Sequence, residues 1–193
     1  MQSQLIPVIK NIIHLSENDE EIILKLFVQK NFRKDEHFLK EGQISKEVGF
    51  IEKGLVRYYI NKEGEDVIYE FGKENDFVCN YESFLDKSAS NKMIQCIEDT
   101  SMLVASYENI QLLYAKISEG QKLGRLVCET LFIQALRQIT SLYTDSPGRR
   151  YRQFLQLYPE LQLRIPQYYI SSYVGVKPQS LSRIRKRDSL HKD

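Results

Sequence analysis

Apolar residues recur every three or four positions at both ends of the chain, and in short runs between polar turns in the middle. The first spacing is typical of helices and the second of strands. A helix over about the first dozen residues is predicted by five apolar positions: Leu5, Ile6, Ile9, Ile12 and Ile13. Ser16 followed by Asp19 resembles a capping box, which predicts a second helix through residues 22–27.

The middle of the chain, residues 31–106, alternates short β-prone runs with turns that contain glycine. Six strands are predicted: Phe38-Leu39, Val48–Ile51, Leu55–Ile60, Asp66–Phe71, Met93–Ile97 and Met102–Ser106. Short strands at intervals of about 8–12 residues are typical of antiparallel barrels, sandwiches and jelly rolls. We therefore expect a β domain between two helical parts.

Helical spacing returns from Tyr107 to Tyr143, with few helix-breaking residues after Gly120. One face of this segment carries six residues that we predict to pair with a copy of the same helix: Leu123, Leu126, Val127, Thr130, Leu131 and Ile133. A long helix with an apolar stripe either crosses a core or pairs with itself. Pairing is favoured because the preceding β domain should have a core of its own.

The last fifty residues predict three further helices after the breaker cluster Ser146–Gly148. The first is expected over Arg149–Tyr158. The other two, Pro166–Tyr173 and Pro178–Arg187, are separated by Gly175–Lys177. Two short helices joined by a turn with glycine have the outline of a helix-turn-helix.

Charge is divided unevenly along the 193 residues, although 27 Lys and Arg nearly balance 26 Asp and Glu. Residues 1–144 hold 17 basic and 22 acidic side chains, while residues 145–193 hold 10 and 4. A basic segment after an acidic body points to nucleic acid or another anionic partner. A solvated basic face without a partner is the alternative reading of the charge alone.

The second helix of the predicted pair carries side chains suited to DNA. Gln179, Ser182 and Arg183 are spaced to face outward, whereas Leu181 and Ile184 should face inward. Arg can bind guanine and Gln can bind adenine through two hydrogen bonds each. Phosphate contacts are predicted for four further residues: Lys177, Ser180, Arg185 and Lys186.

Three segments together resemble the Crp/Fnr family of bacterial transcription regulators. The opening strands of that family's β-roll are similar to FLKEGQISKEVGFIEKGLVRYYINKEGEDVIYEF (Phe38–Phe71), and its last strands to IEDTSMLVAS (Ile97–Ser106). Its helix-turn-helix is similar to SSYVGVKPQSLSRIRKR (Ser171–Arg187). Pro178 stands where the family often reads a base, and only six residues follow Arg187, too few for the usual β-hairpin wing.

The resemblance implies an α+β protein in three parts. Residues 1–106 would form N-terminal helices and an antiparallel double-stranded β-helix (jelly roll) of the cyclic-nucleotide-binding type. Residues 107–144 would form a long dimerisation helix, and 145–193 an all-α DNA-binding domain. It further implies a homodimer on an approximately palindromic double-stranded DNA operator, with RNA polymerase as a further candidate partner. Three widely spaced cysteines make no disulfide framework, and the first ten residues do not resemble a secretory signal, so a reducing cytoplasm is the expected location.

The resemblance also locates an effector pocket. Cyclic-nucleotide members hold the ribose with a Gly-Glu pair and the phosphate with an Arg-Ser pair about ten residues later. Cys79 and Asn80 align with the first pair, and the second pair falls near Ser90 and Asn91. Tyr81 and Lys92 are the neighbouring pocket candidates. A phosphate without its arginine loses a bidentate contact, so cyclic AMP is disfavoured, although Lys92 could supply a point charge. The effector is therefore left open.

Other classes of protein find little support. The sequence has no GxSxG, HExxH or Walker-type loop, so no catalytic residue is predicted. Its cysteines (79, 96 and 128) are too few for a four-thiolate cluster and are expected as buried small hydrophobes; no cofactor or metal is predicted. No apolar run reaches the roughly 18–20 residues of a membrane helix. The remaining alternative is a ligand-binding β-roll whose C-terminal tail contacts protein instead of DNA.

Overall fold

The computed structural model describes residues 3–189 and divides into two compact units. The first contains the chain up to Ile60 together with Phe71–Leu131. The second contains Asn61–Glu70 together with the chain from Phe132 onward. We describe each unit by itself, and the predicted division at residues 106 and 144 stays a prediction.

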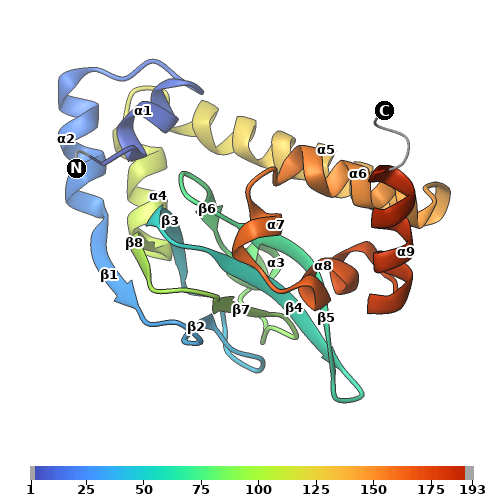
Figure 1. Ribbon diagram of the computed structural model, residues 1–193. Helices are drawn as coiled ribbons and strands as arrows, with labels where there is room; N and C mark the ends of the chain where they lie inside the picture. Colours follow the sequence, from blue (N-terminus) through green and yellow to red (C-terminus); the bar gives the residue numbers. More distant parts are fainter. Residues whose placement is uncertain (1–2, 190–193) are drawn as a thin grey trace. The chain divides into compact units, whose positions relative to one another are not determined.

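Two four-stranded antiparallel sheets form the β domain, whose strands lie in the first unit except for residues 61–70 (Figure 1). The first sheet has the order β1-β8-β3-β6, and the second has the order β2-β7-β4-β5. The strands of the first sheet are β1 (Val28–Phe32), β8 (Thr100–Ser106), β3 (Glu47–Lys53) and β6 (Phe77–Val78). Those of the second are β2 (His37–Leu39), β7 (Met93–Cys96), β4 (Val56–Lys62) and β5 (Glu65–Gly72).

The two sheets pack against each other through small and branched side chains. Gly72 marks this packing, because a Cβ there would lie 3.0 Å from Val56 of its own sheet and 3.4 Å from Ile51 of the other. Ile94 of β7 and Met102 of β8, one from each sheet, are also fully buried. All six predicted strands are confirmed within a few residues.

Four elements were not predicted: strands β1 and β6 and helices α3 (Tyr81–Asp86) and α7 (Leu161–Arg164). Strand β1 lies at the edge of its sheet, with four of its five side chains exposed. It therefore lacks the apolar alternation that identifies a half-buried strand. The other three span two to six residues, too short for a periodic pattern to emerge.

Helices pack on the outer side of β3 and form a second core. They are α1 (Leu5–Lys10), α2 (Glu17–Leu26), α4 (Tyr107–Lys116) and the start of α5 (Gly120–Thr144). Val48 and Phe50 contribute from the strand side, and Ile23 and Leu113 from the helices. The predicted long helix over 107–144 is corrected to two helices, because the chain breaks at Ile117–Glu119. A Cβ at Gly120 would collide with the carbonyl of Tyr114, so glycine permits this tight turn.

The capping box at the start of α2 is confirmed and also joins two distant segments. The buried Asp19 carboxylate accepts hydrogen bonds from the backbone N–H and hydroxyl of Ser16, at 3.0 and 2.7 Å. It also accepts from the N–H and hydroxyl of Ser118, at 3.0 and 2.8 Å. The Ser16 hydroxyl and then the other donors hold the pKa of Asp19 well below its usual range, although burial opposes them.

Asp19→Asn is expected to lower the free energy of unfolding at pH 7 by about 2 kcal/mol, because an amide accepts these hydrogen bonds poorly. A lowered pKa in the folded state stabilises the protein above the unfolded pKa of about 4, and this contribution is lost as the pH falls further. The difference between wild type and Asp19→Asn in urea unfolding should therefore shrink between about pH 7 and about pH 3. Glu17→Gln removes an exposed acid from the same helical turn and is the control. A difference independent of pH would contradict this role of the charge.

The C-terminal part of the second unit consists of short helices. They are α6 (Pro147–Leu157), α7, α8 (Gln167–Val174) and α9 (Pro178–Ser189). Phe154 of α6 is fully buried, with its ring 5.4 Å from that of Tyr173 and 5.5 Å from that of Tyr158. The predicted helices over 149–158, 166–173 and 178–187 are thus confirmed with small shifts of their ends.

Candidate functional site

Helices α8 and α9 are joined by a tight turn that the sequence specifies. Gly175 adopts a left-handed conformation with φ of 73°, which favours glycine. The N–H groups of Gly175 and Val176 bond the carbonyls of Ser172 and Ser171, at 3.0 and 2.9 Å, and so close the end of α8. Pro178 then starts α9, a position where its missing N–H costs nothing.

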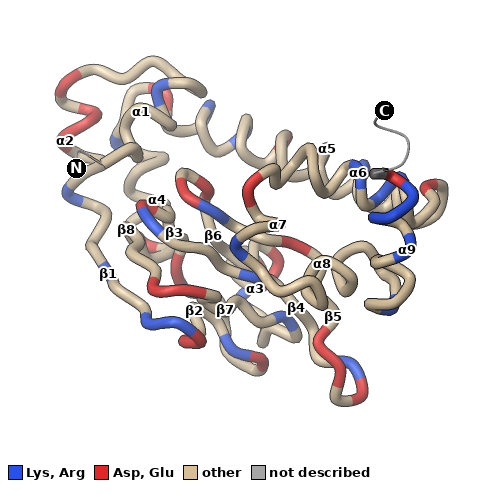
Figure 2. Tube along the Cα trace, viewed as in Figure 1, with Lys and Arg blue, Asp and Glu red and all other residues tan. Residues whose placement is uncertain are grey.

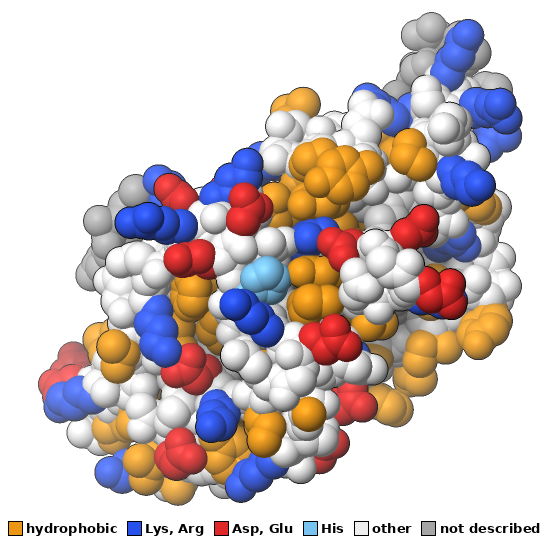
Figure 3. Space-filling model, turned by 90° about the horizontal axis from the view of Figure 1, so that it is seen from below, with side chains coloured by type: hydrophobic (Ala, Val, Ile, Leu, Met, Phe, Trp, Pro, Cys, Tyr) orange, Lys and Arg blue, Asp and Glu red, His pale blue; other side chains and the backbone are white. Residues whose placement is uncertain are grey.

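Helix α9 has one buried face and one exposed face, as predicted. Leu181 and Ile184 are buried against the neighbouring helices. All eight residues predicted to contact DNA are exposed: Lys177, Pro178, Gln179, Ser180, Ser182, Arg183, Arg185 and Lys186. Figure 2 shows the basic positions along α9, and Figure 3 shows Lys and Arg side chains gathered near the C-terminal end of the chain. Their contact with DNA stays a prediction.

Arg150 of α6 supports the turn and was not predicted from the sequence. Its Nε donates to the carbonyl of Val174 at 2.9 Å, and its guanidinium also donates to the carbonyl of Asp145 at 2.8 Å. It therefore ties the end of α8 to the start of α6. Nothing in the local sequence distinguishes it from Arg149, whose exposed side chain pairs with the Asp145 carboxylate at 3.1 Å.

The predicted effector positions lie in one segment between β6 and β7, and their polar groups bond each other. Asn80 and Ser90 are 5% and 4% exposed. The Asn80 amide donates to the Ser90 hydroxyl at 2.7 Å, and that hydroxyl in turn donates to the carbonyl of Lys92 at 2.8 Å. The backbone of Ser90 is bonded to Gln43 and Gly42. We call residues 79–92 the cassette.

Cationic groups of the cassette are also engaged within the protein. The Lys92 ammonium pairs with Glu82 at 2.6 Å, and the Lys87 ammonium lies 4.8 Å from the centre of the Tyr107 ring. The segment contains no arginine. Both ammonium groups thus have partners within the chain. Asn91 is exposed at the edge of the same loop.

Burial favours the neutral forms of two ionisable groups in the cassette, the Cys79 thiol and the Tyr81 phenol. Burial raises the pKa of the Cys79 thiol to about 12, against a weaker opposing effect of the Ser45 hydroxyl. Burial, and after it the neighbouring Tyr114, raises the pKa of Tyr81. Cys96 is buried as expected and Cys79 is partly buried, whereas Cys128 is exposed on α5, which corrects the expectation for that residue. Among residues 3–189, no three His, Cys, Asp or Glu side chains are arranged to hold a metal ion.

Of the six residues of α5 predicted to pair with a second copy, three are exposed and three pack against their own chain; the pairing itself stays a prediction. Leu123 is buried, and Leu126 and Val127 pack partly against the core of the first unit, so these side chains are occupied within the chain. The Thr130 hydroxyl bonds the carbonyl of Leu126 on its own helix. Leu131 and Ile133 are exposed, on the flanks of a stripe that consists of Phe132, Leu136, Ile139 and Tyr143. We call these last four residues the apolar stripe.

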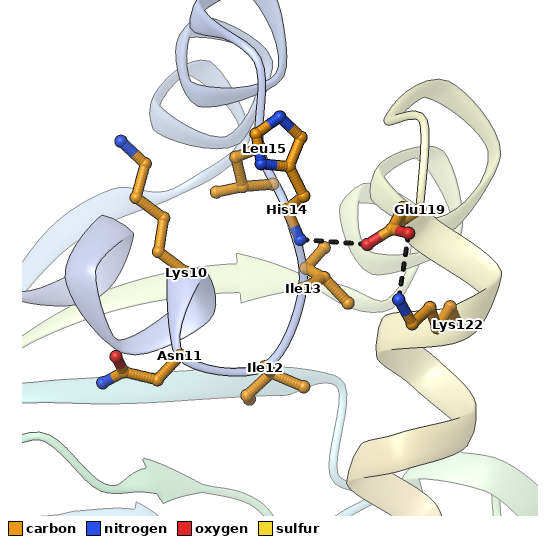
Figure 4. A pocket seen from close by; sticks show the side chains of 8 residues that line it. All are labelled: Lys10, Asn11, Ile12, Ile13, His14, Leu15, Glu119 and Lys122. Atoms are coloured by element: carbon orange, nitrogen blue, oxygen red, sulfur yellow. Dashed lines mark hydrogen bonds and ion pairs between the residues drawn. The ribbon is translucent and has the colours of Figure 1, made fainter.

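A surface pocket of about 580 Å³ lies between the loop Lys10–Leu15 and the start of α5 (Figure 4). Glu119 accepts from the backbone N–H of His14 at 2.9 Å and from the Lys122 ammonium at 3.0 Å. Lys10 pairs with Glu20. The pocket contains none of the predicted site residues. Among residues 3–189, every helix falls short of the combined length and apolar character that a membrane span requires.

Comparison with known proteins identifies the β domain and the overall fold. Residues 29–116 match the cyclic nucleotide-binding domain family. A CooA variant from Carboxydothermus hydrogenoformans superimposes with a TM-score of 0.70 and 20% identity, covering 99% of this chain and 86% of that one. FixK2 from Bradyrhizobium japonicum gives 0.70 and 18%, covering 86% of each chain. The catabolite activator protein of Thermus thermophilus gives 0.57 and 15%, covering 96% of this chain and 88% of that one.

These similarities define a class of fold. Residues 29–116 are similar to cyclic nucleotide-binding domains, and the chain shares the fold of the three proteins over most of its length. A sequence comparison with curated proteins gives no significant match.

Proposed function

We propose that the chain is a DNA-binding transcription regulator of the Crp/Fnr type, acting in the cytoplasm. In this proposal the two sheets are a jelly roll, α8 and α9 are a helix-turn-helix, and α9 enters the major groove. The observation that carries it is the division of α9. Gln179, Ser182 and Arg183 are exposed, whereas Leu181 and Ile184 are buried. A groove-entering helix needs this arrangement of one polar, basic face and one anchored face.

The proposed regulator is a homodimer, paired through the apolar stripe of α5. Phe132, Leu136, Ile139 and Tyr143 follow one another at spacings of four, three and four residues, which is the spacing of a coiled-coil seam. Phe132 is 65% and Tyr143 88% exposed. The opposite face of the same helix contacts its own chain through Ser141, which bonds Gln153 at 3.1 Å. A second copy of α5 is the partner that this spacing fits.

The cassette is proposed to act without a cyclic nucleotide. The hydrogen bond from Asn80 to Ser90 and the ion pair between Lys92 and Glu82 use the groups that a ribose and a phosphate would need. RNA polymerase is a further partner expected of a regulator of this type.

A second candidate function is supported by two exposed leucines. Leu157 at the end of α6 and Leu163 in α7 are exposed, and surface leucines of this kind suit protein contacts. In that case the chain would be a β-roll whose C-terminal helices bind a protein.

Binding to genomic DNA fragments at several salt concentrations separates the two functions. A regulator that makes about six phosphate contacts should lose on the order of 10³-fold in affinity between about 50 and about 200 mM salt, because binding releases counterions. Cyclic AMP and cyclic GMP should leave this affinity unchanged. Absence of DNA binding at low salt would contradict the proposed function. A rise in affinity with either nucleotide would contradict the proposed role of the cassette.

A further inference from the structure

One hydroxyl group of α8 forms two hydrogen bonds with the backbone of strand β5. Ser172 Oγ accepts a hydrogen bond from the backbone N–H of Ile68 at 2.9 Å and donates one to the carbonyl of Asp66 at 3.0 Å. Strand β5 is the last strand of its sheet. Backbone groups two residues apart on an edge strand point the same way. The hydroxyl therefore satisfies the two groups that a further strand would otherwise bind.

This use of the serine is not the usual one on a helix. A helical serine commonly bonds a carbonyl of its own preceding turn. The neighbouring Ser171 does so, because its hydroxyl donates to the carbonyl of Tyr168 at 2.9 Å. Ser171 and Ser172 have the same side chain, but Ser171 bonds its own helix and Ser172 bonds strand β5. Ser171 can therefore serve as a control for Ser172.

A side chain of α5 also bonds the backbone of β5, at Tyr69, the residue after Ile68. Gln138 donates from Nε2 to the carbonyl of Tyr69 at 2.8 Å. Tyr173 also faces this segment: burial and then the nearby Glu70 carboxylate raise the pKa of its phenol. Residues 61–70, which belong to the second unit, therefore contact both α5 and α8. We call residues 61–70 the hairpin. Its turn is tight, with positive φ values at Glu63 and Gly64.

The hairpin leaves the apolar stripe accessible. At 100° per residue, Gln138 lies about 100° to 160° around the helix from the four residues of the apolar stripe. A second copy can therefore pair with the stripe while Gln138 keeps its contact with Tyr69. The hairpin contacts α5 outside the apolar stripe through Gln138, and it contacts α8 in the proposed DNA-binding helices.

We infer that the hairpin is a strut that fixes the direction of α8 relative to α5, with Ser172 and Gln138 as positioning residues. This inference rests on the proposed function. A dimer that reads two half-sites needs its two α9 helices about 34 Å apart along the DNA. A fixed angle between the pairing helix and the DNA-binding helices sets that separation. The strut therefore determines which half-site spacing the dimer prefers.

The test compares Ser172→Ala and Gln138→Ala with wild type on a DNA fragment that carries two half-sites and on an isolated half-site. Each variant should lose affinity for the two-site fragment by about tenfold, the equivalent of about 1.4 kcal/mol. Affinity for the isolated half-site should stay within about twofold. Wild type should discriminate against fragments whose spacing differs by one base pair, and the variants should discriminate less. Ser172→Thr keeps the hydroxyl and should restore wild-type behaviour, and Ser171→Ala should match wild type.

Amide hydrogen exchange at Ile68 gives a measurement that needs no DNA. The Ile68 N–H should be protected in wild type and Ser171→Ala and should exchange faster in Ser172→Ala. Equal exchange in all three proteins would overturn the strut. Equal losses on one-site and two-site DNA would also overturn it, since they would indicate a direct contact or a folding defect. If wild type binds no DNA but its Ile68 N–H is still protected, the proposed function is wrong, and so is the role of the strut in half-site spacing. The hydrogen bond between Ser172 and Ile68 would still stand.

Discussion

Replacing both Leu136 and Ile139 by aspartate is expected to convert the protein from a dimer to a monomer and to reduce its affinity for palindromic DNA by at least about 100-fold. The two side chains lie in the middle of the apolar stripe and are 48% and 52% exposed in the single chain. Like charges at a paired interface repel, and four aspartates would face each other in the dimer. Two linked half-site contacts would then become two independent ones, which removes the gain from linkage. Sedimentation measures the dimer, and fluorescence anisotropy the DNA affinity.

The control for this double variant is Gln134→Asp. Residue 134 is exposed and lies on the face of α5 opposite the stripe, so it adds an aspartate to the same helix without facing the partner. It should stay dimeric and keep its DNA affinity. If the double variant remains dimeric, the pairing face lies elsewhere. If it becomes monomeric but binds palindromic DNA as tightly as wild type, the dimer does not underlie operator binding.

The sequence predicts those features that depend on neighbours in the chain. Ser16 and Asp19 are three residues apart, and the capping box they predict is present. The inward Leu181 and Ile184 and the glycine turn before them follow in the same way from local periodicity and backbone conformation. Strand β1 could not be predicted in this way, because its side chains are mostly polar and exposed. Its partner strand β8 is also distant in the sequence, since it begins at Thr100.

Features that depend on distant partners could not be predicted. Helix α5 has apolar residues on more than one side, and periodicity alone cannot say which side its own chain covers. The structure shows that Leu123, Leu126 and Val127 pack against the first unit's core, which leaves the apolar stripe exposed. Ser172 is separated from Ile68 by 104 residues, and its neighbour Ser171 carries the same side chain. Only the fold distinguishes the serine that holds the hairpin from the one that bonds its own helix.

Arg183→Ala is expected to weaken binding to the preferred operator by about 10- to 100-fold and to relax the base preference at one position of each half-site. Arg183 lies on the exposed face of α9, one helical turn after Gln179 and between the buried Leu181 and Ile184. A guanidinium there can donate two hydrogen bonds to the edge of guanine. Selection of binding sites from random DNA, repeated for wild type and variant, measures the change in preference.

Two further variants decide whether Arg183 reads a base or only supplies charge. Arg183→Lys keeps the charge but not the planar pair of donors, so it should recover little of the lost preference. Lys186→Ala should weaken binding to all sequences by a similar factor and reduce the salt dependence, because a phosphate contact carries no sequence information. If Arg183→Ala instead behaves like Lys186→Ala, Arg183 contacts phosphate, and another residue of α9 determines the operator. If Arg183→Ala changes neither affinity nor preference, α9 is not the helix that enters the groove.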